Sequence, residues 1–512
     1  MTDGSALISA LESATVFGTK PAEITAVCQD SRDVVPGAAF VAVTGGQFDG
    51  HAFLRHARSG GAGLLVVQDD RRGYWEELRD TGVPLVSVPD SRKAVGALAA
   101  AFYHHPARDL PVVGITGTNG KTTTAFLAAG VLAAGGLSPA LLSTAGSAIG
   151  GVLTPNGHHL TTPDAVAVQR FLADARAAGA GCAVIESTSH GLEQGRLSHA
   201  EFDVGVLTNL ADDHLDYHGS REAYLRAKAR LFELLDTSHR KGMAKTAVLN
   251  HDDPAAEVLA LRTGARRLSY GLVRTAGSEV TADRLVHDGW RTSFRLHAGG
   301  RSEPVQLALP GRFNIYNGLA AAAVGIGFGL DLGQIRRGLE SVRQVPGRMQ
   351  PIETGQGFTV VVDYAHNAHG LSRALGFLRE ATRGRVIVVF GCAGDRDPAR
   401  RPAMGRVAAR LADYTVVTSD SSWSEHPERI MAQVAEGLVA AGRESGRDYT
   451  MRADRREAIA HAVSMARPGD TVLVAGMGHE QSMVVAGQAQ PWDDRRAVRE
   501  ILCEPPPVMA TR

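Results

Sequence analysis

The chain is 512 residues long, so we expect about two to four domains rather than one hydrophobic core. Its 54 Lys and Arg residues balance its 54 Asp and Glu residues, which disfavours nucleic acids and anionic membranes as partners. Its four cysteines include no CxxC pair, which excludes a disulfide framework or a structural zinc site. With no signal-peptide pattern and no long apolar run, the chain is predicted to be cytoplasmic with no membrane span. Nothing in the sequence indicates its oligomeric state.

Short apolar segments alternate with helical patterns, which is typical of an α/β fold. In the first hundred residues, strand-like segments at 38–43, 63–67 and 84–88 precede a helix predicted at 91–103. We therefore predict an N-terminal α/β domain at residues 1–108, which would bind the substrate.

A central domain is predicted at residues 109–345, where a buried strand leads through a glycine loop into an alanine-rich helix. Further strands with helices between them predict a mostly parallel, P-loop ATPase-like sheet. Residues 268–309 have the pattern of several antiparallel strands, and helices are expected at 314–328 and 332–342. The predicted parallel strands lie at 111–115, 183–186, 203–208 and 246–250.

A C-terminal domain is predicted at residues 346–512, where four apolar strands separated by helical patterns favour a Rossmann-like, doubly wound sheet. Each strand ends in polar residues or glycine. Because open parallel sheets bind ligands at the carboxyl ends of their strands, these ends are expected to share one crevice. The strands are predicted at 358–362, 385–390, 414–418 and 471–475, and their polar ends at 363–366, 391–397, 419–420 and 476–480.

The strongest local motif runs from Gly114 to Thr124, between a predicted strand and a predicted helix. Its glycines can turn backbone N–H groups toward an anion, Lys121 can contact the terminal phosphates and Thr122 can bind Mg²⁺. The usual Gly-x4-Gly-Lys-Ser/Thr spacing would require glycine at position 115, where this chain has Ile115, so the loop is a variant. Nucleotide binding is favoured over a purely structural glycine turn.

Acidic residues and histidines follow two other predicted strands. Glu186 ends one of them and is either a ligand of a metal ion beside the phosphate loop or a hydrogen-bonded structural carboxylate. Residues 209–218 contain three acidic residues and two histidines, whose oxygen and nitrogen atoms suit Mg²⁺ or Mn²⁺ better than a closed zinc site.

In their order along the chain, these motifs resemble the Mur ligase family, most closely its MurE type. The resemblance covers nearly the whole chain and begins with a uridine-nucleotide-binding segment at residues 30–51. The other matching segments lie at 117–123, 161–164, 186–196, 209–219, 227–232, 347–349, 363–366, 394–397 and 478–480.

The resemblance implies an ATP- and Mg²⁺-dependent ligase that forms an amide bond. The carboxylate of a UDP-sugar peptide would attack the γ-phosphorus of ATP, and a free amino acid would then displace phosphate from the acyl phosphate. Lys228 would be carbamylated into a carboxylate-like metal ligand, whereas sequence context alone favours a solvated helical lysine. The expected catalytic residues are Lys121, Glu186, His214 and Lys228, and the expected metal ligands are Thr122, Glu186, His214 and Lys228.

The resemblance also implies binding roles for individual residues. ATP contacts are expected from Gly117, Thr118, Asn119, Gly120, Lys121, Thr122, Thr123, Asn317 and Arg348. The UDP-linked substrate would be held by Ser31, Thr161, Thr162, Thr188, Gln194 and Arg196. The incoming amino acid would lie among Arg396, Asp420, Trp423, Gly476 and Glu480, with Arg396 on its carboxylate.

One departure from the family bears on the choice of amino acid. Diaminopimelate-adding members carry Asp-Asn-Pro-Arg after a third-domain strand, and its arginine binds the distal carboxylate, whereas this chain has Asp420-Ser421-Ser422-Trp423. Tryptophan lacks the positive charge and the five N–H donors of arginine. We therefore predict that meso-diaminopimelate is not the preferred amino acid and expect a hydrophobic or smaller one, unless a neighbour such as Arg429 replaces the missing guanidinium.

Three alternatives remain at this stage. A ligase of the same type could act on a carboxylate outside cell-wall synthesis, with a changed amino-acid pocket on an intact ATP site. A folylpolyglutamate-synthase-like ligase would share the later domains but lack the segment at 30–51. A nucleotide-binding scaffold without catalysis would require the loss of residues such as Lys121 or Lys228, and both are present.

Overall fold

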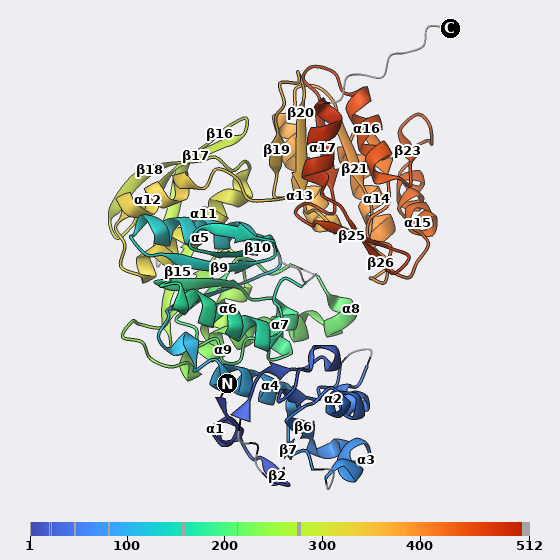
Figure 1. Cartoon of the computed structure of the whole chain (residues 1–512). Coiled ribbons are helices and arrows are strands. Elements are labelled where there is room, and N and C mark those ends of the chain that lie inside the picture. Colours follow the sequence, from blue (N-terminus) through green and yellow to red (C-terminus); the bar gives the residue numbers. More distant parts are fainter. Residues whose placement is uncertain are drawn as a thin grey trace. The chain divides into compact units, whose positions relative to one another are not determined.

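The computed structural model describes residues 2–19, 21, 23–45, 48–79, 82–155, 160–211, 213–273 and 278–503. The chain divides into two compact units (Figure 1). The first contains Met1–Asp283, Arg295–Pro304 and Tyr316–Leu339, and the second contains Arg284–Phe294, Val305–Ile315 and Glu340–Arg512. No helix within the described ranges is long and apolar enough to cross a membrane.

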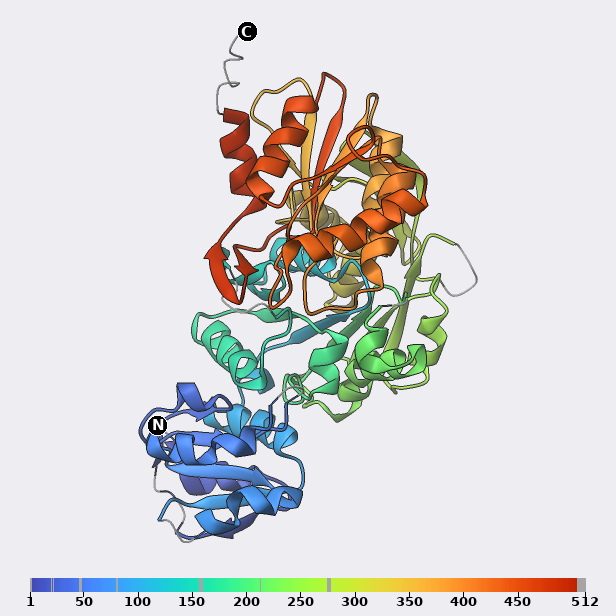
Figure 2. The ribbon, with the colours of Figure 1, turned by 90° about the vertical axis from the view of Figure 1, so that its right-hand side faces the viewer.

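The N-terminal part of the first unit contains, among its described residues, a five-stranded sheet with helices on both faces (Figure 2). Its spatial order is β2 (Thr15–Phe17), β7 (Leu85–Val88), β6 (Leu64–Gln68), β5 (Ala39–Val41) and β4 (Val27–Cys28), and its helices are α1 (Gly4–Ser9), α2 (Leu54–Ser59), α3 (Arg72–Trp75) and α4 (Ser91–Phe102). Alternate strand residues enter two apolar clusters, one with α1 and α4 and one with α2 and α3. The three predicted strands and the predicted helix are all present.

The central part of the chain is built on a sheet that has eleven strands within the described residues. Its spatial order is β11 (Val152–Thr154), β10 (Gly146–Ile149), β9 (Pro139–Ser143), β12 (Cys182–Glu186), β8 (Val112–Thr116), β13 (Val204–Leu207), β14 (Thr246–Asn250), β15 (Arg266–Gly271), β16 (Val280–Asp288), β17 (Arg291–Ala298) and β18 (Arg301–Leu307). The strands from β9 to β15 in this order are parallel, as predicted for β12, β8, β13 and β14, whereas β9 was not predicted.

The prediction of antiparallel strands over residues 268–309 is wrong at its start, because β15 pairs in parallel with both β14 and β16. The first residues of β15 are exposed and the following ones are buried in part, so this strand has the mixed polarity that antiparallel strands often show. The hairpin of β10 and β11 was not predicted.

Helices cover both faces of the parallel strands (Figure 1). α6 (Ala165–Ala177) and α9 (Arg221–Thr237) bury apolar side chains against one face. α5 (Lys121–Ala134), α11 (Arg312–Gly327) and α12 (Leu332–Ser341) lie on the other, and the last two match the predicted helices. A Cβ atom at Gly338 would lie 2.3 Å from the Cα atom of Val131, so this glycine permits the close packing of α12 on α5.

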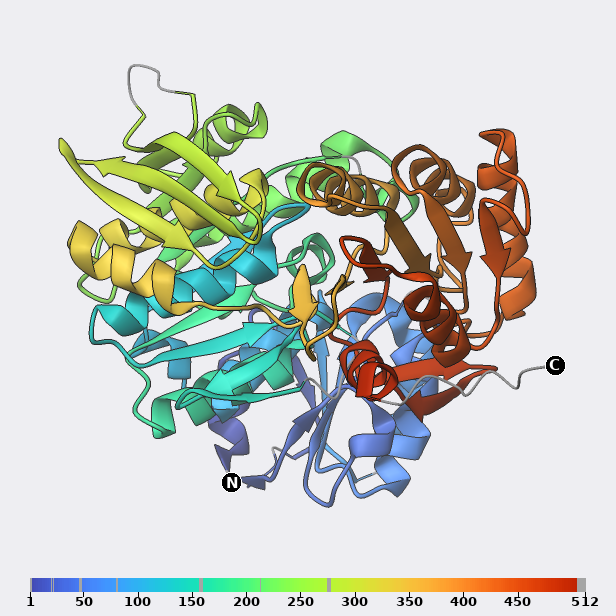
Figure 3. The same cartoon turned by 90° about the horizontal axis from the view of Figure 1, so that it is seen from above.

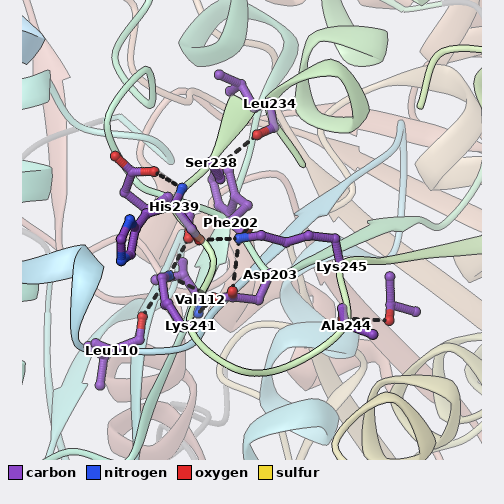
Figure 4. A network of polar contacts seen from close by, with 12 residues as sticks. Leu110, Val112, Phe202, Asp203, Leu234, Ser238, His239, Lys241, Ala244 and Lys245 are labelled. Carbon is purple, nitrogen blue, oxygen red and sulfur yellow. Dashed lines mark hydrogen bonds and ion pairs between the residues drawn. The ribbon is translucent and has the colours of Figure 1, made fainter. Parts of the chain in front are cut away.

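A buried ion-pair network fixes the amino edge of the central sheet (Figure 4). The Asp203 carboxylate is fully buried and accepts hydrogen bonds from the Val112 backbone N–H at 2.8 Å, from Lys241 Nζ at 2.7 Å and from Lys245 Nζ at 2.9 Å. Lys241 Nζ also donates to the Leu110 carbonyl at 2.9 Å. The network therefore joins the starts of β8 and β13 at the edge opposite to the phosphate loop.

The C-terminal part contains a sheet with six strands among the residues that the structure describes. Its order is β19 (Gln350–Ile352), β20 (Thr359–Asp363), β24 (Thr471–Ala475), β21 (Val386–Phe390), β22 (Tyr414–Val417) and β23 (Tyr449–Met451). All strands but β19 are parallel, which confirms the predicted doubly wound sheet; β19, β23 and the hairpin of β25 (Ser482–Val485) with β26 (Gln488–Pro491) were not predicted.

Helices lie on both faces of this sheet (Figure 3). One apolar cluster contains residues of α13 (Ala368–Ala381), α14 (Arg400–Leu411) and α15 (Pro427–Ala440), and a second contains residues of α16 (Arg455–Met465) and α17 (Asp494–Cys503). Because β20, β24, β21 and β22 are parallel, the four predicted polar segments that follow these strands lie at the same carboxyl edge of the sheet.

Candidate active site

The phosphate loop connects β8 to α5 and depends on two glycines with positive φ, Gly117 at 142° and Gly120 at 88°. A Cβ atom at Gly117 would lie 1.9 Å from Thr208 Oγ1, and one at Gly120 would lie 2.4 Å from Asn317 Oδ1. Lys121 begins α5, and its Nζ donates to the Gly117 and Thr118 carbonyls at 3.0 and 2.9 Å. The N–H groups at the start of α5 therefore face a tight turn that suits a phosphate.

The segment after β13 holds this loop in place. Asn209 accepts hydrogen bonds from the backbone N–H groups of Thr118 and Asn119, at 2.8 and 3.1 Å, and its Nδ2 donates to the Asn119 carbonyl at 2.8 Å. The Asn119 Nδ2 atom is itself buried and has no hydrogen-bond partner among the described residues. This amide is available to an acceptor such as a nucleotide oxygen. Asp212, in the same acidic segment, lies outside the described residues.

Lys228, on α9, has a relative exposure of 1%, so the alternative of a solvated lysine is wrong. Its Nζ donates to the Gly117 carbonyl at 2.9 Å and lies 4.3 Å from the centre of the Tyr224 ring. Burial, together with the positive charge of Lys121, holds the pKa of Lys228 well below its usual range, although Asp213 acts in the opposite direction. Burial therefore favours the uncharged form of this amine beside the phosphate loop.

Glu186 ends β12, and its side chain is fully buried. Its two carboxylate oxygens accept hydrogen bonds from Thr144, one from the backbone N–H at 2.9 Å and one from the hydroxyl at 2.8 Å. Within the described part of the chain, no Lys, Arg or His side chain forms an ion pair with it. A buried carboxylate without a counter-charge is unfavourable, so this position fits a cation.

A threonine network extends from Glu186 toward α7 (Ser189–Glu193). Thr162 Oγ1 donates to the Glu186 carbonyl at 2.8 Å and accepts from the Thr188 hydroxyl at 3.0 Å, while the Thr144 and Thr161 hydroxyls are 3.0 Å apart. The predicted substrate residues Thr161, Thr162 and Thr188 therefore lie together.

Arg196 extends this group, because its guanidinium donates to the Thr162 carbonyl at 2.8 Å and to the Gln194 side chain. Gln194 in turn donates to the Tyr217 hydroxyl at 2.9 Å. The predicted donor-binding residues of this domain thus form one connected network.

His214 precedes α8 (Leu215–His218) and has a positive φ of 53°. Its ring centre lies 4.8 Å from that of His190 and 6.4 Å from that of Tyr224. Sequence reasoning missed Thr144 and Tyr224, and it gave no separate role to His190. In the described ranges, no three His, Cys, Asp or Glu side chains form a closed metal site, so a bound Mg²⁺ would need water or phosphate oxygens as additional ligands.

The N-terminal segment at residues 30–51 contains a buried histidine. His51 Nε2 accepts a hydrogen bond from the Gln68 backbone N–H at 3.0 Å, so the Nδ1 atom carries the proton that is shared with Asp49 at 2.6 Å. Ser31 Oγ lies 3.0 Å from His56 Nδ1. The first contacts fix the turn at residues 49–51, and the second connects Ser31 to α2.

The other two predicted ATP contacts lie on different elements. Asn317, on α11, accepts a hydrogen bond from Thr124 Oγ1 at 3.3 Å, so it lies beside the phosphate loop, where Thr122 and Thr123 are buried. Arg348 lies in the second unit, and its guanidinium carbon is 4.6 Å from the centre of the Tyr364 ring.

At the carboxyl edge of the C-terminal sheet, two carboxylates, Asp420 and Glu480, belong to the predicted amino-acid site together with Gly476. A Cβ atom at Gly476 would lie 2.8 Å from Asp420 Oδ2, and the Tyr364 hydroxyl donates to Glu480 at 3.0 Å. Burial raises the pKa of Asp420, and burial together with the charge of Asp420 raises the pKa of Glu480 to about 7. The polar strand ends therefore do meet in one place, as predicted.

Trp423 and Arg396, the other two residues predicted to bind the amino acid with their side chains, lie near each other. The guanidinium carbon of Arg396 lies 5.9 Å from the centre of the Trp423 ring. The Glu425 carboxylate accepts two hydrogen bonds from Arg401, at 2.6 and 2.9 Å, and one from the Asp395 backbone N–H at 2.7 Å. These bonds fix the loop that carries Arg396 to the loop that carries Trp423.

Taken together, a phosphate loop at the edge of a parallel sheet and a second, Rossmann-like sheet with its own acidic site define a nucleotide-dependent enzyme with more than one substrate. Comparison with known proteins agrees. Residues 23–103 match "Mur ligase family, catalytic domain", residues 115–325 match "Mur ligase middle domain" and residues 347–478 match "Mur ligase, glutamate ligase domain".

Individual relatives match over almost the full length. A UDP-N-acetylmuramyl-tripeptide synthetase of Roseiflexus sp. is 41% identical over 94% of this chain and 95% of its own. A UDP-N-acetylmuramoyl-L-alanyl-D-glutamate–2,6-diaminopimelate ligase of Syntrophomonas wolfei is 39% identical over the same shares. A solved structure of a ligase with that second name matches with a TM-score of 0.63 at 32% identity, over 94% of this chain and 95% of its own. The chain therefore belongs to the Mur ligase family, and it is an ATP-dependent ligase that forms amide bonds.

Proposed function

We propose that the protein joins the amino group of a free amino acid to the terminal carboxyl group of a UDP-N-acetylmuramoyl-peptide, with ATP and Mg²⁺, in the cytoplasm. The observation that carries the proposal is the phosphate loop, where Lys121 and the buried Lys228 converge on Gly117 near the start of α5. The names of the relatives support the donor, since they describe ligases of UDP-N-acetylmuramoyl-peptides.

The proposed reaction has two steps that balance without an additional reagent. A carboxylate oxygen of the donor attacks the γ-phosphorus, the bond from that phosphorus to ADP breaks, and an acyl phosphate forms. The amine nitrogen then attacks the acyl carbon, phosphate leaves and the nitrogen loses a proton. Lys121 would neutralise charge on the transferred phosphoryl group, and the loop N–H groups would orient it.

Glu186 and Thr122 are the residues that fit Mg²⁺, with His214 as a further ligand. The fit rests on the buried Glu186 carboxylate, which has hydrogen bonds from Thr144 but no counter-charge. When bound, Mg²⁺ would supply positive charge to the phosphate oxygens.

Lys228 is proposed to be carbamylated. A neutral amine is the form that attacks carbon dioxide, and burial lowers the pKa of Lys228 and so favours that form. The Nζ–C bond would form with loss of one proton and would leave a carboxylate beside the loop. The mass of the intact protein should then exceed the sequence mass by one carbon dioxide, and a Lys228→Met variant should lack the addition.

We propose three functional domains at residues 1–108, 109–345 and 346–512. The first would bind the UDP moiety through Ser31, while Thr161, Thr162, Thr188, Gln194 and Arg196 would hold the muramoyl-peptide. The C-terminal domain would bind the amino acid among Arg396, Asp420, Trp423, Gly476 and Glu480. ATP would contact residues 117–123 with Asn317 and Arg348.

The preferred amino acid is proposed not to be meso-diaminopimelate, although several relatives are named for it. Trp423 supplies no guanidinium for a distal carboxylate, which leaves Arg429 as the neighbouring guanidinium to test. The second candidate function is ligation of a carboxylate from outside cell-wall synthesis, because the predicted amino-acid site differs from that of the family while the phosphate loop is intact.

The deciding experiment is phosphate release from ATP by the full-length protein with UDP-N-acetylmuramoyl-dipeptide and each candidate amino acid in turn. We expect phosphate release that depends on both substrates. We also expect labelled oxygen to pass from the donor carboxyl group to the released phosphate. A Lys121→Ala variant should release none. Binding of ATP without such release would favour a scaffold, and release with another carboxylate only would favour the second candidate.

A further inference from the structure

Arg455 is a fully buried arginine at the start of α16, and it forms a two-point ion pair with Asp494 at the start of α17. Its Nε and Nη2 atoms donate to the two Asp494 carboxylate oxygens, each at 2.7 Å. The Trp492 ring N–H donates to the same carboxylate at 2.8 Å. Both charges are therefore neutralised inside the domain.

The remaining N–H groups of Arg455 bind the ends of two strands. Nη1 donates to the Ser419 carbonyl at 3.1 Å, and Nη2 donates to the Ala475 carbonyl at 2.9 Å. Ser419 and Ala475 directly precede Asp420 and Gly476 in the chain. Arg455 thus reaches the backbone next to two residues of the proposed amino-acid site.

The two strands that Arg455 connects do not pair with each other. β22 and β24 are separated by β21 in the sheet, so no backbone ladder sets the spacing between their ends directly. The guanidinium spans this gap with a rigid, planar group whose donors point in fixed directions.

The spacing between these ends matters because the Asp420 carboxylate lies against Gly476. A Cβ atom at Gly476 would lie 2.8 Å from Asp420 Oδ2 and 4.0 Å from Arg455 Nη2. A small shift of either strand end would therefore open or close the space between them. The positive charge of Arg455 also opposes the effect of burial on Asp420 and favours its charged form.

We propose that Arg455 is a positioning residue for the amino-acid site, which, paired with Asp494, holds the ends of β22 and β24 so that Asp420 and Gly476 face the incoming amino acid at a fixed spacing. The inference rests on the proposed function of that site. The alternative is a purely structural role, in which the Arg455–Asp494 pair only stabilises the packing of α16 and α17.

The chain offers a matched control at the opposite edge of the same sheet. Arg385 and Asp470 precede β21 and β24, and their side chains pair at 2.7 Å, with a further bond from Arg385 to the Met465 carbonyl at 2.7 Å. This pair has similar chemistry but touches no residue of the proposed site. Arg385 is more exposed than Arg455, so Arg385→Lys reports the effect of weakening an arginine–aspartate pair away from the site, and the unfolding temperature measures the structural cost of each variant.

The test compares steady-state kinetics of the full-length wild type, Arg455→Lys and Arg385→Lys, with thermal unfolding of each. For Arg455→Lys we expect the KM for the amino acid to rise about tenfold or more, because a displacement of about 1 Å in a binding site can cost about 100-fold, while the KM values for ATP and the UDP-linked donor stay unchanged. Arg385→Lys should change none of the three KM values. Gly476→Ala crowds Asp420 directly and is also strained by the positive φ of 108° at this position, so it should raise the KM for the amino acid with Arg455 and Asp494 both retained.

Two results would overturn the inference. One is an unchanged amino-acid KM in Arg455→Lys. The other is an equal loss of kcat/KM for all three substrates that follows the unfolding temperature, as for a structural pair. Absence of amine-dependent phosphate release in the wild type is a different outcome, because it overturns the proposed function and the inference together.

Discussion

Lys121 and Lys228 donate hydrogen bonds to the same atom, the carbonyl oxygen of Gly117, at 3.0 and 2.9 Å. Two ammonium groups that converge on one carbonyl in a buried place repel each other, and the burial of Lys228 disfavours its charged form further. The phosphate loop is therefore held by two lysines, Lys121 from its own helix and Lys228 from α9, and burial favours the uncharged form of the second.

Replacement of Lys228 tests whether its amine is used in catalysis. Lys228→Met keeps the length of the side chain and its burial but cannot be carbamylated, and we expect kcat to fall by about 100-fold or more, the loss typical of a group that stabilises reacting charge. Removal of carbon dioxide should lower the activity of the wild type, and bicarbonate should restore it. Activity that stays insensitive to carbon dioxide, with full turnover in the variant, would leave Lys228 a packing residue.

Thr144 is the residue that orients Glu186, so its hydroxyl should matter for ATP use. Thr144→Val removes the hydrogen bond to the Glu186 carboxylate, and we expect kcat/KM for ATP to fall about tenfold, since a bond to a charged group contributes about 1.5–3 kcal/mol. Thr144→Ser keeps the hydroxyl and is the control. A similar loss in both variants would contradict the role of the hydroxyl.

The fold and the phosphate loop follow from local patterns, which explains why they could be predicted. The strand, the glycines and the helix around Lys121 are contiguous in the sequence, and the strands of the C-terminal sheet have fully apolar runs. Burial of Lys228 could also have been predicted, because it lies on the apolar stripe of α9 with Tyr224 and Leu231.

Contacts between distant segments could not be predicted in the same way. Thr144 follows β9 and reaches Glu186 only because β9 pairs with β12, and nothing in its local sequence marks it. The order of strands likewise decides that Arg455 bridges β22 and β24. Such relationships depend on which strands become neighbours, and this is set by the packing of the whole sheet.

Trp423 is expected to disfavour amino acids that carry a second, distal carboxylate. Trp423→Arg restores a guanidinium at that position, and we expect the ratio of kcat/KM for meso-diaminopimelate to that for the amino acid preferred by the wild type to rise about tenfold, because a charge-assisted bond contributes about 1.5–3 kcal/mol. Trp423→Phe keeps an aromatic face for Arg396 and should leave the ratio unchanged. A wild type that already prefers meso-diaminopimelate would refute the prediction.

Asp203 should be essential for stability but not for catalysis, because its network lies at the amino edge of the central sheet (Figure 4). Asp203→Asn leaves two buried ammonium groups without a counter-charge, and we expect a loss of about 3–5 kcal/mol in the free energy of unfolding. The control is Asp109→Asn, which breaks the exposed pair with Arg176 and should cost less than about 1 kcal/mol. Denaturant unfolding measures both, and equal losses would contradict the assignment.

Glu480 gives the amino-acid site a dependence on pH. Its pKa is raised to about 7 by burial and by the charges of Asp420 and Asp494, while Tyr364 and Arg455 act in the opposite direction. Glu480 is therefore mostly protonated below that pH and ionised above it. Because an ionised carboxylate attracts an ammonium group, the KM for the amino acid should fall as the pH rises through about 7.

The Tyr364 hydroxyl is expected to set the pH at which the KM for the amino acid falls. Tyr364→Phe removes the hydrogen bond that lowers the pKa of Glu480, so the fall in KM should move to higher pH while the KM for ATP keeps its own profile. Tyr414→Phe, at the opposite end of β22, should leave the profile unchanged. If the profile of Tyr364→Phe coincides with that of the wild type, then Glu480 is not the group that titrates, and the amino acid must be held through another contact.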